Sequence, residues 1–151
     1  MTIALVALAA AGLIPLATAA VINGTAQADA LTGTSERDSI HARGGGDTAS
    51  GRGGGDFIWG ESGDDELSGN RGRDRVWGGS GNDTVNGGNG ADILLAGGSG
   101  NDTVNGGGGN DVITGGPGDD TITCGAGADT AYADEGDTVA DDCEERVSAA
   151  P

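Results

Sequence analysis

The sequence has no lysine, a single histidine and very few aromatic side chains, which make up 3% of its 151 residues. Glycine, by contrast, occupies 33 positions. Glycine contributes no apolar side-chain surface and loses more backbone freedom than any other residue when a chain becomes ordered. A conventional side-chain core is therefore hard to build, and something other than apolar burial must hold this chain in one conformation.

Positive charge is also scarce, because seven basic residues stand against 24 acidic ones and the formal net charge is −17. Such a charge repels nucleic acid and anionic lipid. We therefore expect no nucleic-acid partner and no membrane partner for the mature chain, and we expect cations instead. High charge with low hydrophobicity is typical of disordered tails as well. The order of residues along the chain has to distinguish a disordered tail from a folded protein that binds cations.

No catalytic constellation is evident in the sequence. His41 is the single histidine, and no serine or cysteine has a plausible base at a suitable spacing. Adjacent acids such as Asp64 and Asp65 belong to a repeat rather than to an isolated acid pair. We therefore expect a protein that is not an enzyme.

The first 21 residues carry no charged side chain and run into the small residues Ala17 to Ala19. This pattern is typical of a secretory signal peptide, here residues 1–19 with cleavage before Ala20; a retained membrane anchor is the alternative. A signal peptide predicts a secreted, extracellular protein. Cys124 and Cys143 suit an oxidising compartment, and we expect a disulfide between them, since two cysteines and one distant histidine cannot complete a zinc site.

Aspartate recurs every nine residues along most of the chain, with one extra residue near Leu95. Self-similarity at a fixed period is typical of stacked repeat architectures and rare in disordered tails. The residue two places after each aspartate is apolar, and the residue two places before it is glycine in ten consecutive repeats, from Gly45 to Gly127. The twelve repeating aspartates are Asp29, Asp38, Asp47, Asp56, Asp65, Asp74, Asp83, Asp92, Asp102, Asp111, Asp120 and Asp129.

The most regular loops read GGSGND at residues 78–83 and GGGGND at residues 106–111. They resemble the hemolysin-type calcium-binding repeat, the RTX nonapeptide GGxGxDxUx, in which the aspartate holds the sixth position. The resemblance implies an all-β fold, a right-handed parallel β-roll (a β-helix solenoid) with two nonapeptides per turn. In such a turn six residues of each repeat form a loop and three form a short strand. We expect this roll over residues 20–132.

Residues 133–151 are expected to form the polar end cap that a repeat stack requires. The segment from Cys124 to Cys143 also resembles the tail of small secreted calcium-binding proteins of actinobacteria. A further metal site is the alternative role for the acids of the cap, which are Asp134, Asp137, Asp141 and Asp142.

Stacking of the turns makes neighbours of aspartates that lie two repeats apart. Carboxylates at strand spacing repel one another unless a cation lies between them, and calcium accepts six to eight hard oxygens in a flexible geometry, which suits such a gap better than magnesium. Aspartates that only hydrogen-bond their own turns are the alternative. We expect the chain to fold as about eight Ca²⁺ ions bind in two columns. The first two loops lack the inner glycine, so the expected ligands are Asp47, Asp56, Asp65, Asp74, Asp83, Asp92, Asp102, Asp111, Asp120 and Asp129.

The outward side chains of the two expected sheets differ. One face carries threonine and asparagine, including Thr84, Thr103 and Thr121. Recognition of ice, mineral or glycan through this face is the alternative to a function as a calcium-binding module. The other face carries an apolar strip and predicts a homodimer or another protein partner, although cross-strand pairing or cover by the C-terminal tail would also account for it. The strip consists of Phe57, Trp59, Trp77, Ile93, Leu95 and Tyr132.

Overall fold

A computed structural model describes residues 18–148. These residues form fifteen strands, and no helix among them is long and apolar enough to cross a membrane. The signal peptide expected at residues 1–19 lies almost entirely outside the described residues.

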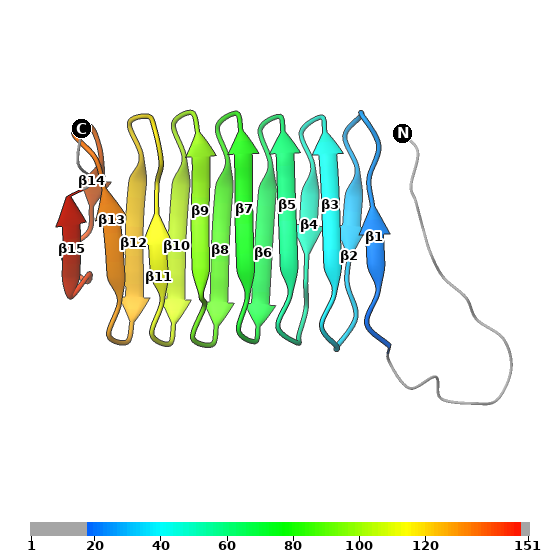
Figure 1. The fold of residues 1–151 in the computed structure, drawn as a ribbon, viewed down its shortest axis with the longest axis horizontal. Helices are drawn as coiled ribbons and strands as arrows, with labels where there is room; N and C mark the ends of the chain where they lie inside the picture. Colours follow the sequence, from blue (N-terminus) through cyan, green and yellow to red (C-terminus); the bar gives the residue numbers. More distant parts are fainter. Residues whose placement is uncertain (1–17, 149–151) are drawn as a thin grey trace, which may run out of the picture.

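The strands form two sheets that lie face to face, one built from the odd-numbered strands and one from the even-numbered strands (Figure 1). The odd sheet contains β1 (Val21–Asn23), β3 (Ser39–Gly44), β5 (Phe57–Ser62), β7 (Arg75–Ser80), β9 (Leu94–Ser99), β11 (Val112–Thr114), β13 (Thr130–Ala133) and β15 (Glu145–Ser148). The even sheet contains β2 (Ala30–Thr32), β4 (Thr48–Ser50), β6 (Glu66–Arg71), β8 (Thr84–Asn89), β10 (Thr103–Gly108), β12 (Thr121–Ala126) and β14 (Thr138–Val139).

Neighbouring strands within each sheet are parallel and keep the repeat in register. Ile58 of β5 pairs with Val76 of β7, and Leu67 of β6 pairs with Val85 of β8. Both pairs are 18 residues apart, so two nonapeptides complete one turn and each turn adds one strand to each sheet. The predicted parallel β-roll with two repeats per turn is confirmed.

The core between the sheets is one side chain thick, because most strands contribute a single large inward residue, with alanine in β4 and β13. This residue holds the eighth position of its repeat, and strand alternation turns its neighbours outward. The largest fully buried members are Ile40, Ile58, Leu67, Val76, Val85, Leu95, Val104, Ile113 and Ile122.

Most strands are longer than the three residues expected for each repeat. Eight of them, including β7 and β8, span six residues. Because identical loops stack, their backbone groups also meet at strand spacing, and the pairing of Gly79 with Gly98 extends the sheet into the first half of each loop. The chain keeps its loop conformation there, with positive φ at the second repeat position.

That second position holds threonine in the first two repeats, four other residues in the third to sixth, and glycine from the seventh repeat on. Arg43, Arg52, Glu61 and Asn70 occupy it with φ between 73° and 82°. A non-glycine residue in this left-handed region is disfavoured by contact of its Cβ with the backbone. The third to sixth repeats are therefore the strained part of the stack.

Two details of the apolar pattern are corrected by the structure, both next to the extra residue. Leu95 was expected on the outer face and Leu94 in the core, but Leu95 is fully buried and pairs with Val76, while Leu94 pairs with Arg75 on the outer face. The reason is strand alternation: Gly97 must face inward against Asp102, so the inward side chain is the one two residues earlier. The extra residue is Ile93, which precedes β9.

This register can be tested by two leucine variants. Leu95→Ala leaves a cavity in the core and is expected to lower the free energy of unfolding of the calcium-loaded protein by about 2–5 kcal/mol. Leu94→Ala removes an outer side chain and should cost roughly 1 kcal/mol or less. Urea denaturation in calcium buffer measures both, and a larger loss for Leu94→Ala would contradict the register.

The C-terminal segment continues both sheets beyond the twelfth repeat. Thr138 of β14 pairs with Thr121, and β15 pairs with β13. The expected disulfide is present between Cys124, at the start of the last repeat, and Cys143. The cap is thus an irregular extra turn that is tied covalently to the roll.

Candidate metal centre

All twelve repeating aspartates are buried, with at most 7% of each residue exposed. They line the two edges of the roll, where the chain passes from one sheet to the other. We call the loops that lead into the even sheet edge A and those that lead into the odd sheet edge B. Edge A contains Asp29, Asp47, Asp65, Asp83, Asp102 and Asp120; edge B contains Asp38, Asp56, Asp74, Asp92, Asp111 and Asp129.

In every repeating aspartate except Asp29, one carboxylate oxygen accepts a backbone hydrogen bond from the preceding turn, and these bonds form a ladder along each edge. The backbone amide of Asp29 donates to Oδ1 of Asp47 at 2.7 Å, and the amide of Asp83 donates to Oδ1 of Asp102 at 2.7 Å. The separation grows from 18 to 19 residues across the extra residue, so the ladder continues through it. Each of these carboxylates therefore holds the preceding turn in place through its backbone.

The two ladders end on acids of the cap. The amide of Asp120 donates to Oδ1 of Asp137 at 3.0 Å, and the amide of Asp129 donates to Oε2 of Glu144 at 3.0 Å. The repeat pattern did not predict these roles, because the two acids lie 17 and 15 residues after their donors. Asp142 accepts from the amides of Cys124 and Gly125.

The second oxygen, Oδ2, has no such partner in ten of the twelve aspartates. Among the described residues these ten atoms are buried and receive no hydrogen bond. A buried charged oxygen without a partner costs free energy, so a positively charged ligand fits there. The ten are the ligands predicted from the sequence, Asp47, Asp56, Asp65, Asp74, Asp83, Asp92, Asp102, Asp111, Asp120 and Asp129; that they bind calcium stays a prediction.

The first two repeats satisfy the same oxygen with threonine. The amide and hydroxyl of Thr25 donate to Oδ2 of Asp29 at 2.6 and 2.8 Å. In the next repeat the amide and hydroxyl of Thr34 donate to Oδ2 of Asp38 at 2.5 and 3.1 Å. A hydroxyl thus fills the role that a cation would fill in the later loops, in agreement with the exclusion of these two aspartates from the expected ligands.

The first glycine of each repeat makes room for this carboxylate. A side chain at Gly60 or Gly78 would collide with Oδ2 of the aspartate five residues later. Two repeats depart from glycine, with the buried residues Ala42 and Cys124 in this position. The first glycine of GGxGxD therefore makes room for the carboxylate, whereas the second and fourth positions adopt positive φ, as at Gly79 and Gly81.

Burial and mutual repulsion oppose ionisation of the aspartates. Desolvation raises the pKa of Asp92 to about 7, a hydrogen bond from the Asp74 amide lowers it, and the charges of Asp74 and Asp111 raise it further. Desolvation likewise raises the pKa of Asp56, Asp83 and Asp120 to about 6 from an ordinary value of 3.8. At neutral pH the ionised aspartates therefore destabilise the folded chain when no metal is bound.

These shifts predict how acidity affects the calcium-free chain. Because the folded pKa values lie above the unfolded value of 3.8, the charged carboxylates destabilise the roll above about pH 7, and this penalty fades as the pH falls through 7 and 6. In chelator, far-ultraviolet circular dichroism should therefore show more β-structure at pH 5 than at pH 8. Asp92→Asn should reduce the gain, and a signal that falls between pH 8 and pH 5 would contradict the prediction.

The odd sheet carries Phe57, Trp59, Trp77 and Tyr132 of the expected apolar strip on its outer face, whereas Leu95 is buried and Ile93 precedes β9. Trp59 and Trp77 are register partners on adjacent strands, as an 18-residue turn requires. Trp77 and Tyr132 are 48% and 42% exposed, whereas the indole of Trp59 is half-buried and stacks on the His41 ring at 4.4 Å. Phe57 and Ile93 are half-buried.

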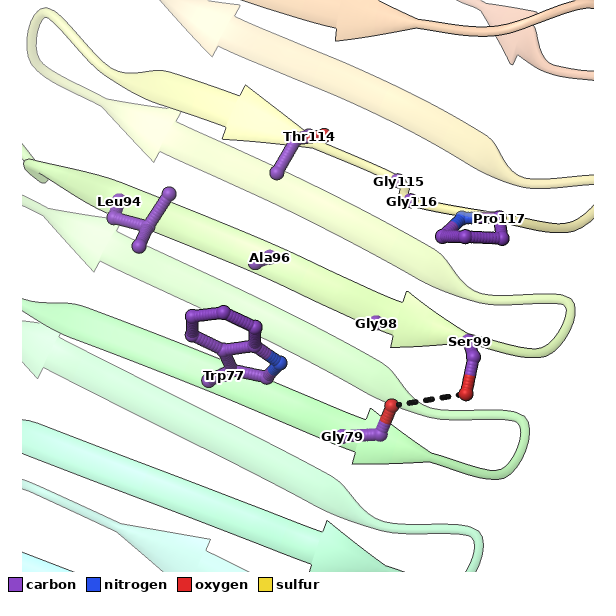
Figure 2. A pocket seen from close by; sticks show the side chains of 10 residues that line it. All are labelled: Trp77, Gly79, Leu94, Ala96, Gly98, Ser99, Thr114, Gly115, Gly116 and Pro117. Atoms are coloured by element: carbon purple, nitrogen blue, oxygen red, sulfur yellow. Dashed lines mark hydrogen bonds between the residues drawn. The ribbon is translucent and has the colours of Figure 1, made fainter.

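A hollow of about 370 Å³ lies beside Trp77 on this face. Ala96 takes the place of a large side chain next to the indole, and Leu94 and Pro117 border the opening (Figure 2). Glycine backbone forms much of the remaining lining (Figure 2). A protruding indole therefore adjoins a depression in the same surface.

The fold and the acid columns define a parallel β-solenoid with a carboxylate site repeated along both edges. The chain belongs to the family of the RTX calcium-binding nonapeptide repeat, whose model matches it in four copies at residues 23–58, 59–94, 96–131 and 116–137. Calcium is therefore the cation of these repeats. A search of curated proteins found no match to this chain.

Proposed function

We propose that this protein is an extracellular calcium-binding module, not an enzyme, which folds when Ca²⁺ enters the two aspartate columns. The ten buried Oδ2 atoms without partners carry the proposal. Each would contribute its oxygen to the ions in the gaps on either side of it, and carbonyl oxygens of adjacent loops are suitable further ligands because calcium takes six to eight hard oxygens. The disulfide and the family are in keeping with secretion after removal of residues 1–19.

The number of ions follows from the two columns. Five ligating aspartates in a column leave four gaps, so the roll would hold about eight ions. Their combined charge of roughly +16 nearly cancels the formal charge of −17. The ions would then link adjacent turns and also remove the repulsion within each column.

Native mass spectrometry of the secreted protein in saturating calcium counts these ions directly. We expect about eight bound ions, and far fewer with magnesium at the same concentration, because magnesium requires a stricter octahedral geometry. One or two bound ions, or equal binding of magnesium, would contradict the proposal.

We further propose that the strip formed by Phe57, Trp59, Trp77, Ile93 and Tyr132 joins two copies of the calcium-loaded protein. Trp77 is exposed and stands beside a hollow. In a two-fold contact the same surface of both copies meets, so the indole of each copy could enter the hollow of the other. Sedimentation in calcium should show a dimer for the wild type and a monomer for Trp59→Ser/Trp77→Ser. A monomeric wild type would assign the strip to stabilisation of the sheet itself.

The threonine face supports a second candidate function, recognition of ice, mineral or glycan. Strand pairing places Thr84, Thr103, Thr121 and Thr138 on four adjacent strands of the even sheet. The last of these comes from the cap, so the row is one residue longer than the repeats alone predict. Thermal hysteresis in calcium buffer, lost in Thr103→Val/Thr121→Val, would support recognition of ice.

A further inference from the structure

Positive charge is concentrated on one edge of this acidic protein. Of its seven basic residues, four lie in the edge B loops of residues 33–38, 51–56 and 69–74, and a fifth begins the strand that follows. These loops contain one exposed acid, Glu36, besides their buried aspartates. The arginines of this cluster, here called the arginine row, are Arg37, Arg52, Arg71, Arg73 and Arg75.

The guanidinium groups of the row are not used in ion pairs within residues 18–148. The ion pairs found there join His41 to Glu61 and Arg146 to Asp141. Arg37, Arg52, Arg71 and Arg73 are exposed, and Arg75 is half-buried. The row therefore presents exposed positive charge that forms no ion pair with the described residues.

Two members of the row are held in place by neighbouring turns. Arg37 donates from Nε to the carbonyl of Gly55 at 3.0 Å, and its Cζ lies 5.9 Å from the centre of the Phe57 ring. The Cζ of Arg75 lies 5.2 Å from the same ring. Phe57 thus orders guanidiniums from the turns on both sides of it, which lowers the entropy lost when a ligand binds.

A comparison with edge A shows that the net positive charge of the exposed side chains is confined to edge B. The edge A loops of the same turns, residues 24–29, 42–47 and 60–65, contain Arg43 with the exposed acids Glu61 and Asp64. The exposed side chains of the two edges therefore differ in the sign of their net charge at the same level of the roll, positive on edge B and negative on edge A. A negatively charged ligand would be attracted to edge B and repelled from edge A.

We propose that edge B binds a linear acidic polysaccharide along the axis of the roll through the arginine row. Guanidinium groups pair with carboxylate or sulfate through two parallel hydrogen bonds. Arg37 and Arg73 share the fifth repeat position two turns apart, so stacking separates them along the axis by about 9.6 Å, which is close to the length of two pyranose residues. The row spans three turns, so it fits a polymer with repeated charges better than a single small anion.

A polysaccharide fits this surface better than a nucleic acid. Double-stranded DNA carries one charge per about 1.7 Å and would bring dense negative charge against the surrounding acidic surface. A sugar chain with one acid per residue brings fewer charges. The inference depends on the proposed function in one respect: calcium should strengthen binding because it neutralises the columns behind the row.

Binding of the calcium-loaded protein to carboxymethyl-dextran, with unmodified dextran as the neutral control, tests the proposal. Arg52→Gln/Arg73→Gln should weaken binding on the order of tenfold or more, because hydrogen bonds between charged groups are lost. Arg43→Gln/Arg146→Gln is the matched control, since it removes the same charge elsewhere and Arg43 shares the positive-φ repeat position of Arg52; it should bind within about twofold of the wild type, because exposed charges away from a site contribute little.

Equal loss in the two double variants, equal binding of unmodified dextran, or tighter binding of oligothymidylate than of carboxymethyl-dextran would overturn the proposal. Circular dichroism recorded on the same samples separates this result from the calcium hypothesis. A chain whose spectrum does not respond to calcium would contradict the proposed function. A wild type that folds with calcium but does not bind carboxymethyl-dextran would contradict only the proposal that the arginine row binds an acidic polysaccharide.

Discussion

Removal of calcium is expected to unfold the roll, and millimolar calcium is expected to restore it in one cooperative transition. The core is a single layer of aliphatic side chains between two sheets, and 33 of 151 residues are glycines that lose much backbone entropy on folding. Without metal, ten buried carboxylate oxygens have no partner. The folded chain therefore lacks enough favourable interactions until cations bind, and binding free energy becomes folding free energy.

Far-ultraviolet circular dichroism and sedimentation velocity measure this transition as calcium is added to the stripped protein. We expect a compact β-rich state in calcium and an expanded chain in chelator. Magnesium at equal concentration is the control and should have a much smaller effect. Compact β-structure that persists in excess chelator would show that the ladders and the disulfide are sufficient to hold the fold.

Asp102→Asn is expected to raise the calcium concentration at the folding midpoint strongly, whereas Asp29→Asn should leave it nearly unchanged. Asp102 lies between Asp83 and Asp120 on edge A, and its Oδ2 is one of the ten unsatisfied atoms. An asparagine keeps the acceptor for the Asp83 amide but replaces Oδ2 with an NH₂ group, which cannot bind a cation. Two adjacent gaps each lose one ligand.

Asp29→Asn is the matched control, because the substitution is chemically the same. Its Oδ2 already accepts from the amide and hydroxyl of Thr25, and the asparagine amide can turn to present its oxygen to the same donors. Calcium titrations followed by circular dichroism compare the two midpoints. Equal shifts for Asp102→Asn and Asp29→Asn would show that the unsatisfied oxygens do not define the ion sites.

The nine-residue period was sufficient to predict the class of fold and the columns of aspartate. The period fixes which residues become neighbours once turns stack, so the pairing of Trp59 with Trp77 could be predicted without coordinates. The lack of glycine at the fourth position of the first two repeats also predicted that Asp29 and Asp38 differ from the other aspartates. The reason for the separation, the threonine donors, could have been found in Thr25 and Thr34, which both stand four residues before an aspartate.

Errors arose where the period is broken. Near Ile93 the apolar pattern alone permits either Leu94 or Leu95 to face inward, and only the spacing to Gly97 decides between them. Asp137 and Glu144 were missed as the ends of the ladders because their spacings of 17 and 15 residues lie outside the repeat. Their role depends on how the irregular cap folds against the last turn, which a local pattern does not encode.

The disulfide should make the two ends of the roll differ in their resistance to mechanical force. In a stack where each turn contacts only its neighbours, tension applied to the two ends should peel turns off one at a time, each 18-residue turn lengthening the chain by about 60 Å. At the C-terminal end β15 lies beyond Cys143 and can separate from β13, but the Cys124–Cys143 bond closes residues 124–143, so that segment cannot lengthen and β12 must separate together with β13 and β14. Loss of whole turns should therefore start at β1, where pairing with β3 over three residues holds the end of the odd sheet, and the protein should resist pulling more strongly at its C-terminal end than at its N-terminal end.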